Sequence, residues 1–319
     1  MNLKNVDALK KNDKFAAIDI GSHNCRLLIS ERDQGITKSV FNSSIPTNLI
    51  KNLSYNNEFN YKNIKKTIEC LNFFSKKIKS MDVKKYKCIA TEACRSVINP
   101  EYFVKEVKSQ TGLKVEIIES IEEARLSMKS CSTYISKIKK PGLIFDIGGG
   151  STELSCFNIK PNEIVTKSIS YGVINFNEKC DIFSLNYVTD DLNRHFSNYF
   201  QNLKINTDEK FIAIGSCSTV TSLCCVFLNL PFYNPKKIEG YEMSSNEVVK
   251  TINFLEKQND KELQKNACIG ERYMLLKNGI KILKIIMKNF PIENVIVTQK
   301  GLRDALTEEI ILNYEKNKS

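Results

Sequence analysis

The stretch that decides the fold is Leu143-Ile144-Phe145-Asp146-Ile147-Gly148-Gly149-Gly150-Ser151-Thr152-Glu153. In it, a short apolar run ends at an aspartate, and three consecutive glycines then lead to two hydroxyl residues and a glutamate. An apolar run bounded by glycines is typical of a buried strand. Glycines let the backbone turn with positive φ and direct its N–H groups at a ligand. The stretch therefore predicts a strand followed by a phosphate-binding loop, with an ordinary hairpin turn as the alternative.

A near-copy of this stretch lies early in the chain, at Ala17-Ile18-Asp19-Ile20-Gly21-Ser22-His23-Asn24. Each copy opens one half of the chain with a strand, an aspartate, a Gly/Ser turn and a second strand. Internal duplication of this kind predicts two related domains that face each other across a cleft, with both loops directed at one ligand. We place the domains at residues 1–138 and 139–319, and we allow for the last helix packing back on the first domain.

Strands alternate with helices along both halves, which indicates an α/β architecture with a largely parallel sheet. In the first half we expect strands at 15–20, 25–30, 36–41, 86–90 and 115–118, and helices at 60–79, 100–111 and 120–138. In the second half we expect strands at 143–147, 153–158, 163–169, 211–214 and 295–297, and helices at 184–203, 246–257, 264–289 and from Leu302 onward. A further helix should follow the Gly/Ser turn at residues 215–219, the third such turn in the chain.

The composition is that of a folded globular protein. The 319 residues are enough for one large or two ordinary domains. No apolar run approaches the ~20 residues that cross a bilayer, and the lysine-rich residues 1–14 lack the apolar segment of a secretory signal. We therefore expect a cytoplasmic protein that has no membrane partner.

Eleven cysteines and two histidines are spread along the chain. The cysteines form no CxxC pair, several of them adjoin apolar residues, and two histidines are too few to make a zinc site attractive. We expect reduced, mostly buried thiols, as in cytosolic proteins.

The net charge of +11 suggests polyanionic partners such as polyphosphate, a nucleotide or nucleic acid. The abundance of Lys, Asn and Ile also fits an AT-rich genome, in which case most of the lysines are simply a solvated surface. No recognised RNA- or DNA-binding motif accompanies the charge, so we expect no specific nucleic-acid partner.

Together with Glu122-Glu123-Ala124-Arg125, the two loops resemble the exopolyphosphatase/guanosine pentaphosphate phosphohydrolase (Ppx/GppA) family. The resemblance covers nearly the whole chain and includes the segments Ala90–Arg95, Gly112–Arg125, Asp146–Glu153 and Gly301–Arg303. It implies two actin-like domains of the ribonuclease H-like type, the superfold shared with sugar kinases and Hsp70 ATPases, with a cleft between them. The resemblance is to the short, two-domain form of the family, which lacks the C-terminal helical domains of the long form.

The resemblance implies Mg²⁺-dependent hydrolysis of terminal phosphoanhydride bonds, foremost as an exopolyphosphatase that releases orthophosphate from polyphosphate. The alternatives are a phosphohydrolase of guanosine pentaphosphate (pppGpp) and a sensor that binds (p)ppGpp or another nucleotide without hydrolysis. A kinase or chaperone-type ATPase of the same superfold is a further rival, against which the Glu-Glu-Ala-Arg block weighs. The family also makes a homodimer plausible.

The resemblance assigns roles to individual residues. It makes Glu123 the general base that activates the attacking water and Glu153 the second catalytic carboxylate, which positions that water or the metal. Asp19 and Asp146 would hold Mg²⁺ through waters, with Glu153 as a further metal ligand. The phosphate-binding residues would be Gly21, Ser22, Asn24, Arg95, Gly148, Gly149, Gly150, Ser151 and Thr152. These assignments suit phosphoryl transfer, which needs positioning and charge neutralisation more than a protein nucleophile.

Simpler interpretations stand beside these roles. The spacing of Ser120 and Glu123 also fits a capping box, in which the glutamate only stabilises the start of a helix. Arg95 could pair with Glu92 or a helix end instead of a phosphate. Ser151 and Thr152 could simply begin a strand.

The chain departs from the family pattern in its second half. The turn at residues 215–219 carries side chains where the family usually has glycine, and these would crowd a purine or a phosphate. Asn175 stands where arginine is common, and Met274 stands where aspartate is often found. Water activation is therefore better supported by the sequence than the identity of the substrate.

Overall fold

The computed structural model describes residues 13–33, 35–53, 57–159, 164–205 and 209–317. The chain divides into two compact units, which we describe one at a time. Unit 1 comprises Met1–Leu126 and Leu302–Ser319, and unit 2 comprises Ser127–Gly301. The expectations for residues 1–12 and for the strand start at residue 163 fall outside the described residues.

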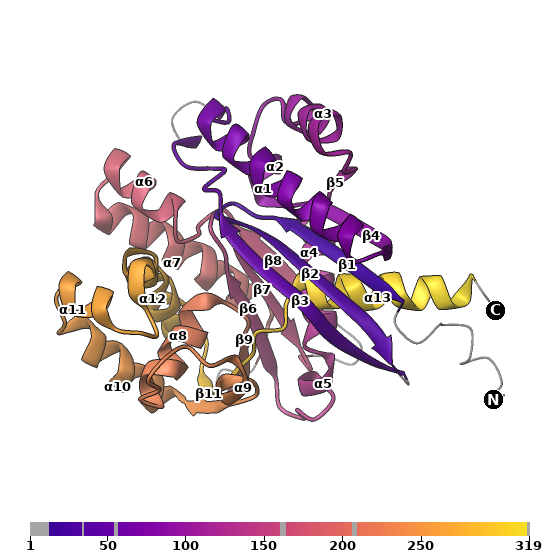
Figure 1. Cartoon of the computed structure of the whole chain (residues 1–319). Helices are drawn as coiled ribbons and strands as arrows, with labels where there is room; N and C mark the ends of the chain where they lie inside the picture. The colour runs from indigo at the N-terminus through magenta and orange to yellow at the C-terminus, as the bar shows by residue number, and fades with distance from the viewer. Residues whose placement is uncertain (1–12, 34, 54–56, 160–163, 206–208, 318–319) are drawn as a thin grey trace. The chain divides into compact units, whose positions relative to one another are not determined.

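Unit 1 is an α/β unit built on one five-stranded sheet (Figure 1). Its strands are β1 (Lys14–Ile20), β2 (Asn24–Asp33), β3 (Ile36–Pro46), β4 (Val83–Ala90) and β5 (Val115–Ile117). Its helices are α1 (Tyr61–Ser80), α2 (Glu92–Arg95), α3 (Pro100–Thr111), α4 (Ser120–Ser130, whose end passes into unit 2) and α13 (Leu302–Lys316). The sheet order is β3-β2-β1-β4-β5, in which β1, β2 and β3 form an antiparallel meander and β1, β4 and β5 run parallel.

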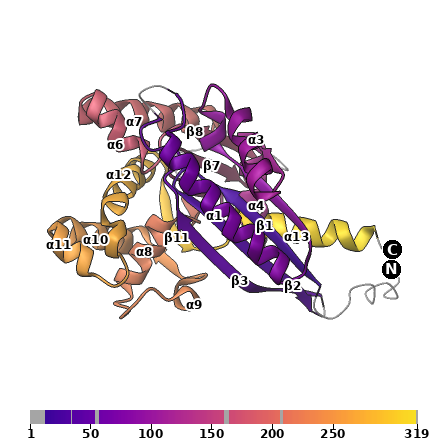
Figure 2. The same ribbon diagram turned by 45° about the horizontal axis from the view of Figure 1, so that its top comes forward.

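Two helices cover opposite faces of this sheet (Figure 2). On α1, the predicted apolar stripe is buried as expected, at Ile64, Ile68, Leu71, Phe74 and Ile78. On the other face, Phe15 and Ala17 of β1 pack with Leu306 and Ile310 of α13. Because side chains alternate along a strand, Asp19 shares the α13 face with Phe15 and Ala17.

Unit 2 repeats this plan with a six-stranded sheet of order β10-β11-β9-β6-β7-β8. Its strands are β6 (Gly142–Ile147), β7 (Thr152–Phe157), β8 (Val165–Ile169), β9 (Phe211–Gly215), β10 (Glu242–Ser244) and β11 (Ile292–Val297). Its helices are α5 (Ser132–Ile135), α6 (Asn175–Ile182), α7 (Leu185–Asn202), α8 (Ser218–Phe227), α9 (Pro235–Ile238), α10 (Ser245–Glu256), α11 (Asp260–Lys265) and α12 (Tyr273–Asn289). Again a meander, β6 to β8, is followed by parallel pairing of β6 with β9 and of β9 with β11.

The two faces of the unit 2 sheet have separate cores. Leu143, Phe145 and Ile147 of β6 pack into the large core that α7, α8, α10 and α12 complete. Ile144, which points the other way, packs with Met128, Cys131 and Phe157 in a smaller cluster. By the same alternation, Asp146 lies on the face of the smaller cluster.

Local sequence signals explain where several helices begin and end. Pro100 occupies the first turn of α3, and Gly112 ends that helix with a left-handed φ of 73°, a conformation that glycine adopts at little cost. Ser244 and Glu247 form a capping box at the start of α10. The predicted α/β class is therefore confirmed in both units.

Three expectations about the chain need correction. The predicted helix 120–138 breaks at Cys131, and its second part, α5, packs on the unit 2 sheet through Tyr134 and Ile135. The chain consequently passes from unit 1 to unit 2 at residues 126/127, whereas we placed the boundary at 138/139. The last helix belongs to unit 1, as we allowed for. The predicted helix 264–289 is divided into α11, a 3₁₀ helix at Gly270–Arg272 and α12.

A fourth correction concerns the thiols. Cys225 and Cys268 form a disulfide, whereas the sequence led us to expect every cysteine to be reduced. The other nine are free thiols, and all but Cys180 are buried.

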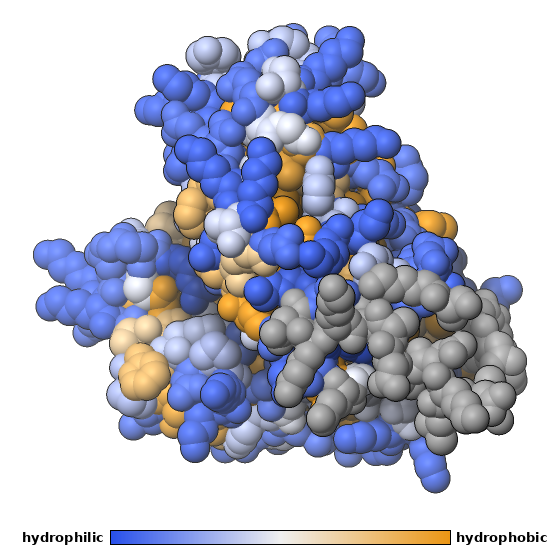
Figure 3. Space-filling model, turned by 45° about the vertical axis from the view of Figure 1, so that its right-hand side comes forward, coloured by the Kyte–Doolittle hydropathy of each residue, from blue (hydrophilic) through white to orange (hydrophobic). Residues whose placement is uncertain are grey.

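The surface carries the excess of positive charge. No lysine is buried among the described residues, and hydrophilic side chains predominate on the face shown in Figure 3. In the described part of the chain, no helix has the length and apolar character needed to cross a membrane.

Close packing of α12 against α8 gives a first testable prediction. A Cβ at Gly279 would lie 2.1 Å from Thr219 Oγ1, so Gly279→Ala should overpack the core and cost ~1–3 kcal/mol. Urea unfolding followed by circular dichroism measures this loss. Gly301→Ala is the control, because a Cβ there meets no atom within 4 Å. Adding Thr219→Ala should recover part of the loss, and no recovery would contradict the packing argument.

Candidate phosphate site

The glycine loop of unit 2 connects β6 to β7 in a tight turn. The Gly148 N–H donates to the Ser151 carbonyl at 2.9 Å. Within the described residues, no acceptor meets the N–H groups of Gly149 and Gly150. Backbone N–H groups that are withheld from water need a partner, and successive groups of this kind make a concave site for an anion.

A segment that follows β8 holds the opposite side of this loop. The N–H groups of Val173 and Ile174 donate to the carbonyls of Gly148 and Gly149, both at 2.9 Å. Asn175 Nδ2 donates to the Gly150 carbonyl at 2.6 Å, so all three glycine carbonyls are bonded to this segment. The carbonyls are thus fixed on one side, which keeps the loop in a single conformation.

Gly172 allows this segment to approach so closely. A Cβ there would lie 2.4 Å from the Gly149 carbonyl carbon, a distance that no side chain tolerates. Its N–H also donates to Asn175 Oδ1 at 2.7 Å. Asn175, which the sequence marked only as a departure from the family pattern, therefore bridges Gly172 and Gly150 and supports the loop.

Two carboxylates lie side by side where β6 and β7 meet the loop. Asp146 and Glu153 are directly paired in the register of these strands, and such partners project to the same face. Glu153 is buried at 5% exposure, and its Oε1 accepts hydrogen bonds from the hydroxyls of Ser151 at 2.5 Å and Ser168 at 2.9 Å. Like charges in directly opposed positions destabilise a sheet, so this pair is suited to a bound cation.

The two hydroxyl residues of the loop have partners inside the protein. Ser151 donates to Glu153, and Thr152, which is fully buried, donates to the Tyr171 carbonyl at 2.6 Å. Their side chains therefore orient the carboxylate and the loop, and their role as phosphate ligands stays a prediction.

The corresponding turn of unit 1 is arranged differently. Gly21 N–H donates to the Asn24 carbonyl at 3.0 Å, as Gly148 does to Ser151 in unit 2. His23 Nδ1 lies 2.5 Å from Asn48 Oδ1, and the carbonyls of His23 and Ser22 accept from the backbone at residues 47–50. The turn is thus fixed by the segment at residues 47–50, which follows β3.

Asp19 is directly paired with Arg26 across β1 and β2. Arg26 Nη1 lies 3.3 Å from Asp19 Oδ2, so this position holds an ion pair where unit 2 holds two carboxylates. Arg303, in the first turn of α13, interacts electrostatically with both residues. Asp19 therefore has a cationic neighbour, and its role as a metal ligand stays a prediction.

Arg303 and Arg26 are two positively charged groups in one place. Burial, followed by repulsion from Arg26, lowers the pKa of Arg303, and its Nη1 donates to Asn42 Oδ1 at 2.9 Å. Neither arginine was predicted as a site residue. The signal for Arg303 was present in the motif Gly301–Arg303, but only the tertiary structure brings that motif to Asp19.

Glu123 and Arg95 form an ion pair at the end of β5. Arg95 Nη2 donates to Glu123 Oε2 at 2.8 Å and to Glu92 Oε2 at 3.2 Å, while its Nη1 donates to the Ile118 carbonyl at 2.7 Å. Arg95 thus has the predicted bond to Glu92 and also holds the proposed catalytic glutamate.

The capping-box alternative for Glu123 depended on Ser120 preceding the helix. Instead α4 begins at Ser120, and the N–H of Glu123 donates to the carbonyl of Glu119 at 3.0 Å. The cap position therefore falls on Glu119, one residue earlier than the box requires. The neighbouring Glu122 points elsewhere, to Arg125 at 2.7 Å.

The third turn, at residues 215–219, begins α8. The Ser216 N–H donates to the Phe145 carbonyl at 3.2 Å, which ties this turn to β6. Among the described residues, Ser216 Oγ is buried and has no hydrogen-bond partner. Met274, on α12, is 44% exposed, so it takes no part in the core.

Each unit brings together its own set of predicted residues. Unit 1 joins Glu123 to Arg95 and places Asp19 beside Arg26, and unit 2 joins Asp146 and Glu153 to the glycine loop. The idea that both sets act on one ligand in a cleft stays a prediction.

The bridge made by Asn175 can be tested directly. Asn175→Ala leaves the Gly172 N–H and the Gly150 carbonyl without their partner, which should cost ~1–3 kcal/mol. Amide hydrogen exchange should also become faster at Val173 and Ile174, whose N–H groups bind the loop. Asn294→Ala is the matched control, because its side chain makes an exposed bond to Glu242. Unchanged exchange in Asn175→Ala would show that the loop does not depend on this bridge.

Comparison with known sequences identifies the family. The model of the Ppx/GppA phosphatase family matches residues 28–314. The chain is 30% identical over 323 residues to a bifunctional 3-dehydroquinate synthase/phosphatase of Fusobacterium nucleatum, covering 97% of this chain and 48% of that protein. It is 28% identical over 140 residues to a guanosine-5'-triphosphate,3'-diphosphate pyrophosphatase of Photobacterium profundum, covering 44% of this chain and 28% of that protein. The chain thus spans less than half the length of either curated relative.

Solved structures agree with this assignment. A Ppx/GppA family member from Aquifex aeolicus has a TM-score of 0.75 and 25% identity, covering 94% of this chain and 98% of that one. An exopolyphosphatase from Cytophaga hutchinsonii has the same fold, with a TM-score of 0.81, 18% identity and coverage of 94% and 98%. The predicted resemblance is confirmed: the chain belongs to the Ppx/GppA phosphatase family.

Proposed function

We propose that this protein hydrolyses terminal phosphoanhydride bonds, with polyphosphate as the first candidate substrate and orthophosphate as the product. The observation that carries the proposal is the paired carboxylates Asp146 and Glu153 beside a loop whose Gly149 and Gly150 N–H groups meet no acceptor in the described part of the chain. A site that joins open N–H donors to a cation-binding pair suits a phosphate chain, which is highly charged. The phosphatase named in the Fusobacterium relative supports the same reaction class.

Phosphate binding would fall mainly to backbone groups and arginines. In unit 2, Val173, Ile174 and Asn175 bind the carbonyls of the glycine loop, while the N–H groups of Gly149 and Gly150 meet no acceptor among the described residues. In unit 1, Arg26 and Arg303 repel each other, and a phosphate group would relieve that repulsion by bidentate contacts. We therefore add these two arginines to the predicted phosphate-binding residues.

Mg²⁺ is the metal that we propose for Asp146 and Glu153. In the described residues, no group of three or more His, Cys, Asp or Glu side chains comes together, but Mg²⁺ commonly needs only one or two carboxylates, with waters and substrate phosphates completing its shell. When bound, the ion would neutralise charge on the phosphate oxygens. Because Arg26 already balances its charge, we propose that Asp19 chiefly orients that arginine.

Glu123 is the residue that we propose to activate water. Its carboxylate is held by Arg95 at 2.8 Å, which fixes its position, and a carboxylate can act as a general base toward water. Glu123 would take a proton from the attacking water, and no covalent intermediate on the protein is needed. Arg95 is then a positioning residue in this reaction.

Two other functions remain as candidates. Hydrolysis of pppGpp is favoured by the Photobacterium relative, which is named for that type of substrate. A sensor that binds a guanosine tetra- or pentaphosphate without hydrolysis is favoured by the third turn, where Ser216 and its neighbours replace glycine. A cytoplasmic location and a homodimer stay predictions.

A substrate comparison tests the proposal. Phosphate release should be measured by malachite green with long-chain polyphosphate and with pppGpp in parallel, each with Mg²⁺ and with excess EDTA. We expect faster release from polyphosphate and loss of release with EDTA, because the proposed site at Asp146 and Glu153 uses Mg²⁺ to neutralise the phosphate oxygens. Release from neither substrate, together with tight pppGpp binding by calorimetry, would select the sensor.

Substitution of single glutamates tests the assigned roles. Glu123→Gln and Glu153→Gln should each lower kcat by ~10²-fold or more, the usual effect of losing a general base or an equivalent group. Glu122→Gln is the matched control, because its partner is the exposed Arg125, and exposed ion pairs contribute little. A normal rate in Glu123→Gln would assign that residue to the structure of α4 alone. Loss of activity in both variants would show that each unit is required.

A further inference from the structure

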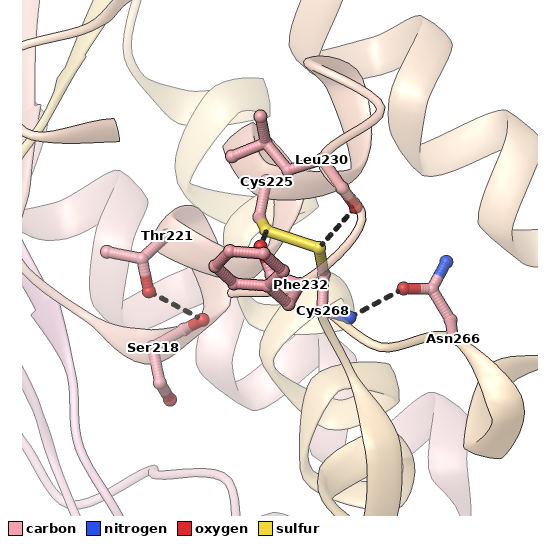
Figure 4. Close-up of a disulfide and its surroundings, with 7 residues drawn as sticks. All are labelled: Ser218, Thr221, Cys225, Leu230, Phe232, Asn266 and Cys268. Atoms are coloured by element: carbon pink, nitrogen blue, oxygen red, sulfur yellow. Dashed lines mark hydrogen bonds between the residues drawn. A yellow bond between two sulfur atoms is a disulfide. The ribbon is translucent and has the colours of Figure 1, made fainter. Parts of the chain in front are cut away.

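Cys225 and Cys268 come from separate elements of unit 2, 43 residues apart, and form a disulfide (Figure 4). Cys225 lies near the end of α8, and Cys268 precedes the 3₁₀ helix that leads into α12. The Cys268 N–H donates to Asn266 Oδ1 at 2.9 Å, which fixes the backbone at this position. The neighbouring Cys224 is a buried free thiol, so adjacency in the chain does not decide which cysteine is paired.

The surroundings provide for a reduced state as well as an oxidised one. The Leu230 carbonyl lies 3.4 Å from Cys268 Sγ, and the Phe232 carbonyl lies 3.6 Å from Cys225 Sγ. A disulfide has no hydrogen to donate, whereas two thiols would each find an acceptor already in place. A purely structural disulfide gains nothing from such acceptors. The dithiol form is therefore compatible with the same backbone.

The disulfide joins α8 to the segment that leads into α12, the helix that contacts the support of the glycine loop. On α12, Asn278 Nδ2 donates to the Val173 carbonyl at 2.8 Å, and Val173 in turn binds Gly148. On α8, Thr219 packs against Gly279 of α12. A bond between the start of the α12 segment and the end of α8 therefore restrains the support of the loop.

We propose that Cys225 and Cys268 are a reversible redox site, whose oxidation stiffens the α8–α12 support of the glycine loop and whose reduction loosens it. The reducing partner is a dithiol. One of its thiolates attacks a protein sulfur, the S–S bond breaks and a mixed disulfide forms; its second thiolate then displaces the protein sulfur. The protein gains two electrons and two protons, and the reductant leaves as a disulfide.

Access to the sulfurs requires a local opening. Cys225 is completely buried and Cys268 is 2% exposed, and the connection between α8 and α9 provides the two carbonyls that face them. Phe232 in this connection is 59% exposed and lies beside the sulfurs in Figure 4. Opening of this short connection would admit a small dithiol without unfolding the sheet.

Thiol trapping tests the redox site without reference to catalysis. The intact protein is equilibrated in buffers with graded ratios of reduced to oxidised dithiothreitol, quenched in acid, denatured and labelled with a maleimide–polyethylene glycol. We expect a single reversible transition in which reduction adds two labels. Cys225→Ser and Cys268→Ser should abolish this transition, and Cys224→Ser, the adjacent control, should retain it. The proposal would be overturned if Cys225 and Cys268 stayed labelled at every ratio, because the disulfide would then never form. It would also be overturned if the disulfide in the native protein stayed unreduced at every ratio.

The link to the loop has a separate test, which rests on the proposed hydrolysis. The Michaelis constant for polyphosphate should rise about fivefold on reduction, within the range expected for coupling through packed elements, while kcat changes little. Cys225→Ser should show the reduced-state value in both buffers, and Cys224→Ser should follow the wild type. Equal Michaelis constants in the two states would refute the coupling, whereas absence of any hydrolysis with a normal trapping transition would refute only the proposed function.

Discussion

Unit 2 depends on the hydrogen bonds that hold the carbonyls of its glycine loop. Gly148, Gly149 and Gly150 each accept a hydrogen bond at their carbonyl from the segment at 173–175, and within the described residues the N–H groups of Gly149 and Gly150 meet no acceptor. The segment itself is held by Asn278 of α12, and α12 is positioned by its close contact with α8. Glycine itself is flexible, so the loop is held in place by the elements that bind its carbonyls. Preorganised donors of this kind cost no reorganisation when a phosphate binds.

The two units share one strand order but use it for different electrostatics. The residues opposite the two loop aspartates are Arg26 in unit 1 and Glu153 in unit 2. In unit 1, Asp19 forms an ion pair with Arg26, and Arg303 interacts with Arg26, Asp19 and Asp304. In unit 2 two carboxylates face each other in the register of β6 and β7. The duplicated strand–turn–strand structure thus carries an opposite charge at the position that faces the aspartate in each unit.

Much of the fold was predictable because periodicity and turn residues are local signals. The apolar stripe of α1 and the ends of α3 were predicted correctly, since the stripe follows a 3.6-residue period and Pro100 and Gly112 mark the ends. The break at Cys131 was not predictable, because Cys131 packs against Ile144, Phe157 and Ile214 of the unit 2 sheet, which come later in the chain. The same holds for the disulfide, since nothing in the spacing distinguishes Cys225 from Cys224. Asn175 was interpreted as a lost arginine, but its amide has a structural role that only the folded segment reveals.

The sequence by itself determined the duplicated strand–loop–strand plan, the α/β class, the family resemblance and the glycine loop as the phosphate-binding candidate. These follow from residues that are neighbours in the chain, where spacing and residue type carry the information. Only the tertiary structure decided that Glu123 meets Arg95, that Arg303 comes to Asp19, and that Asp146 stands opposite Glu153. Those pairs depend on strand register and helix packing between distant segments, and the charge of a site is set by such pairs and not by any one residue.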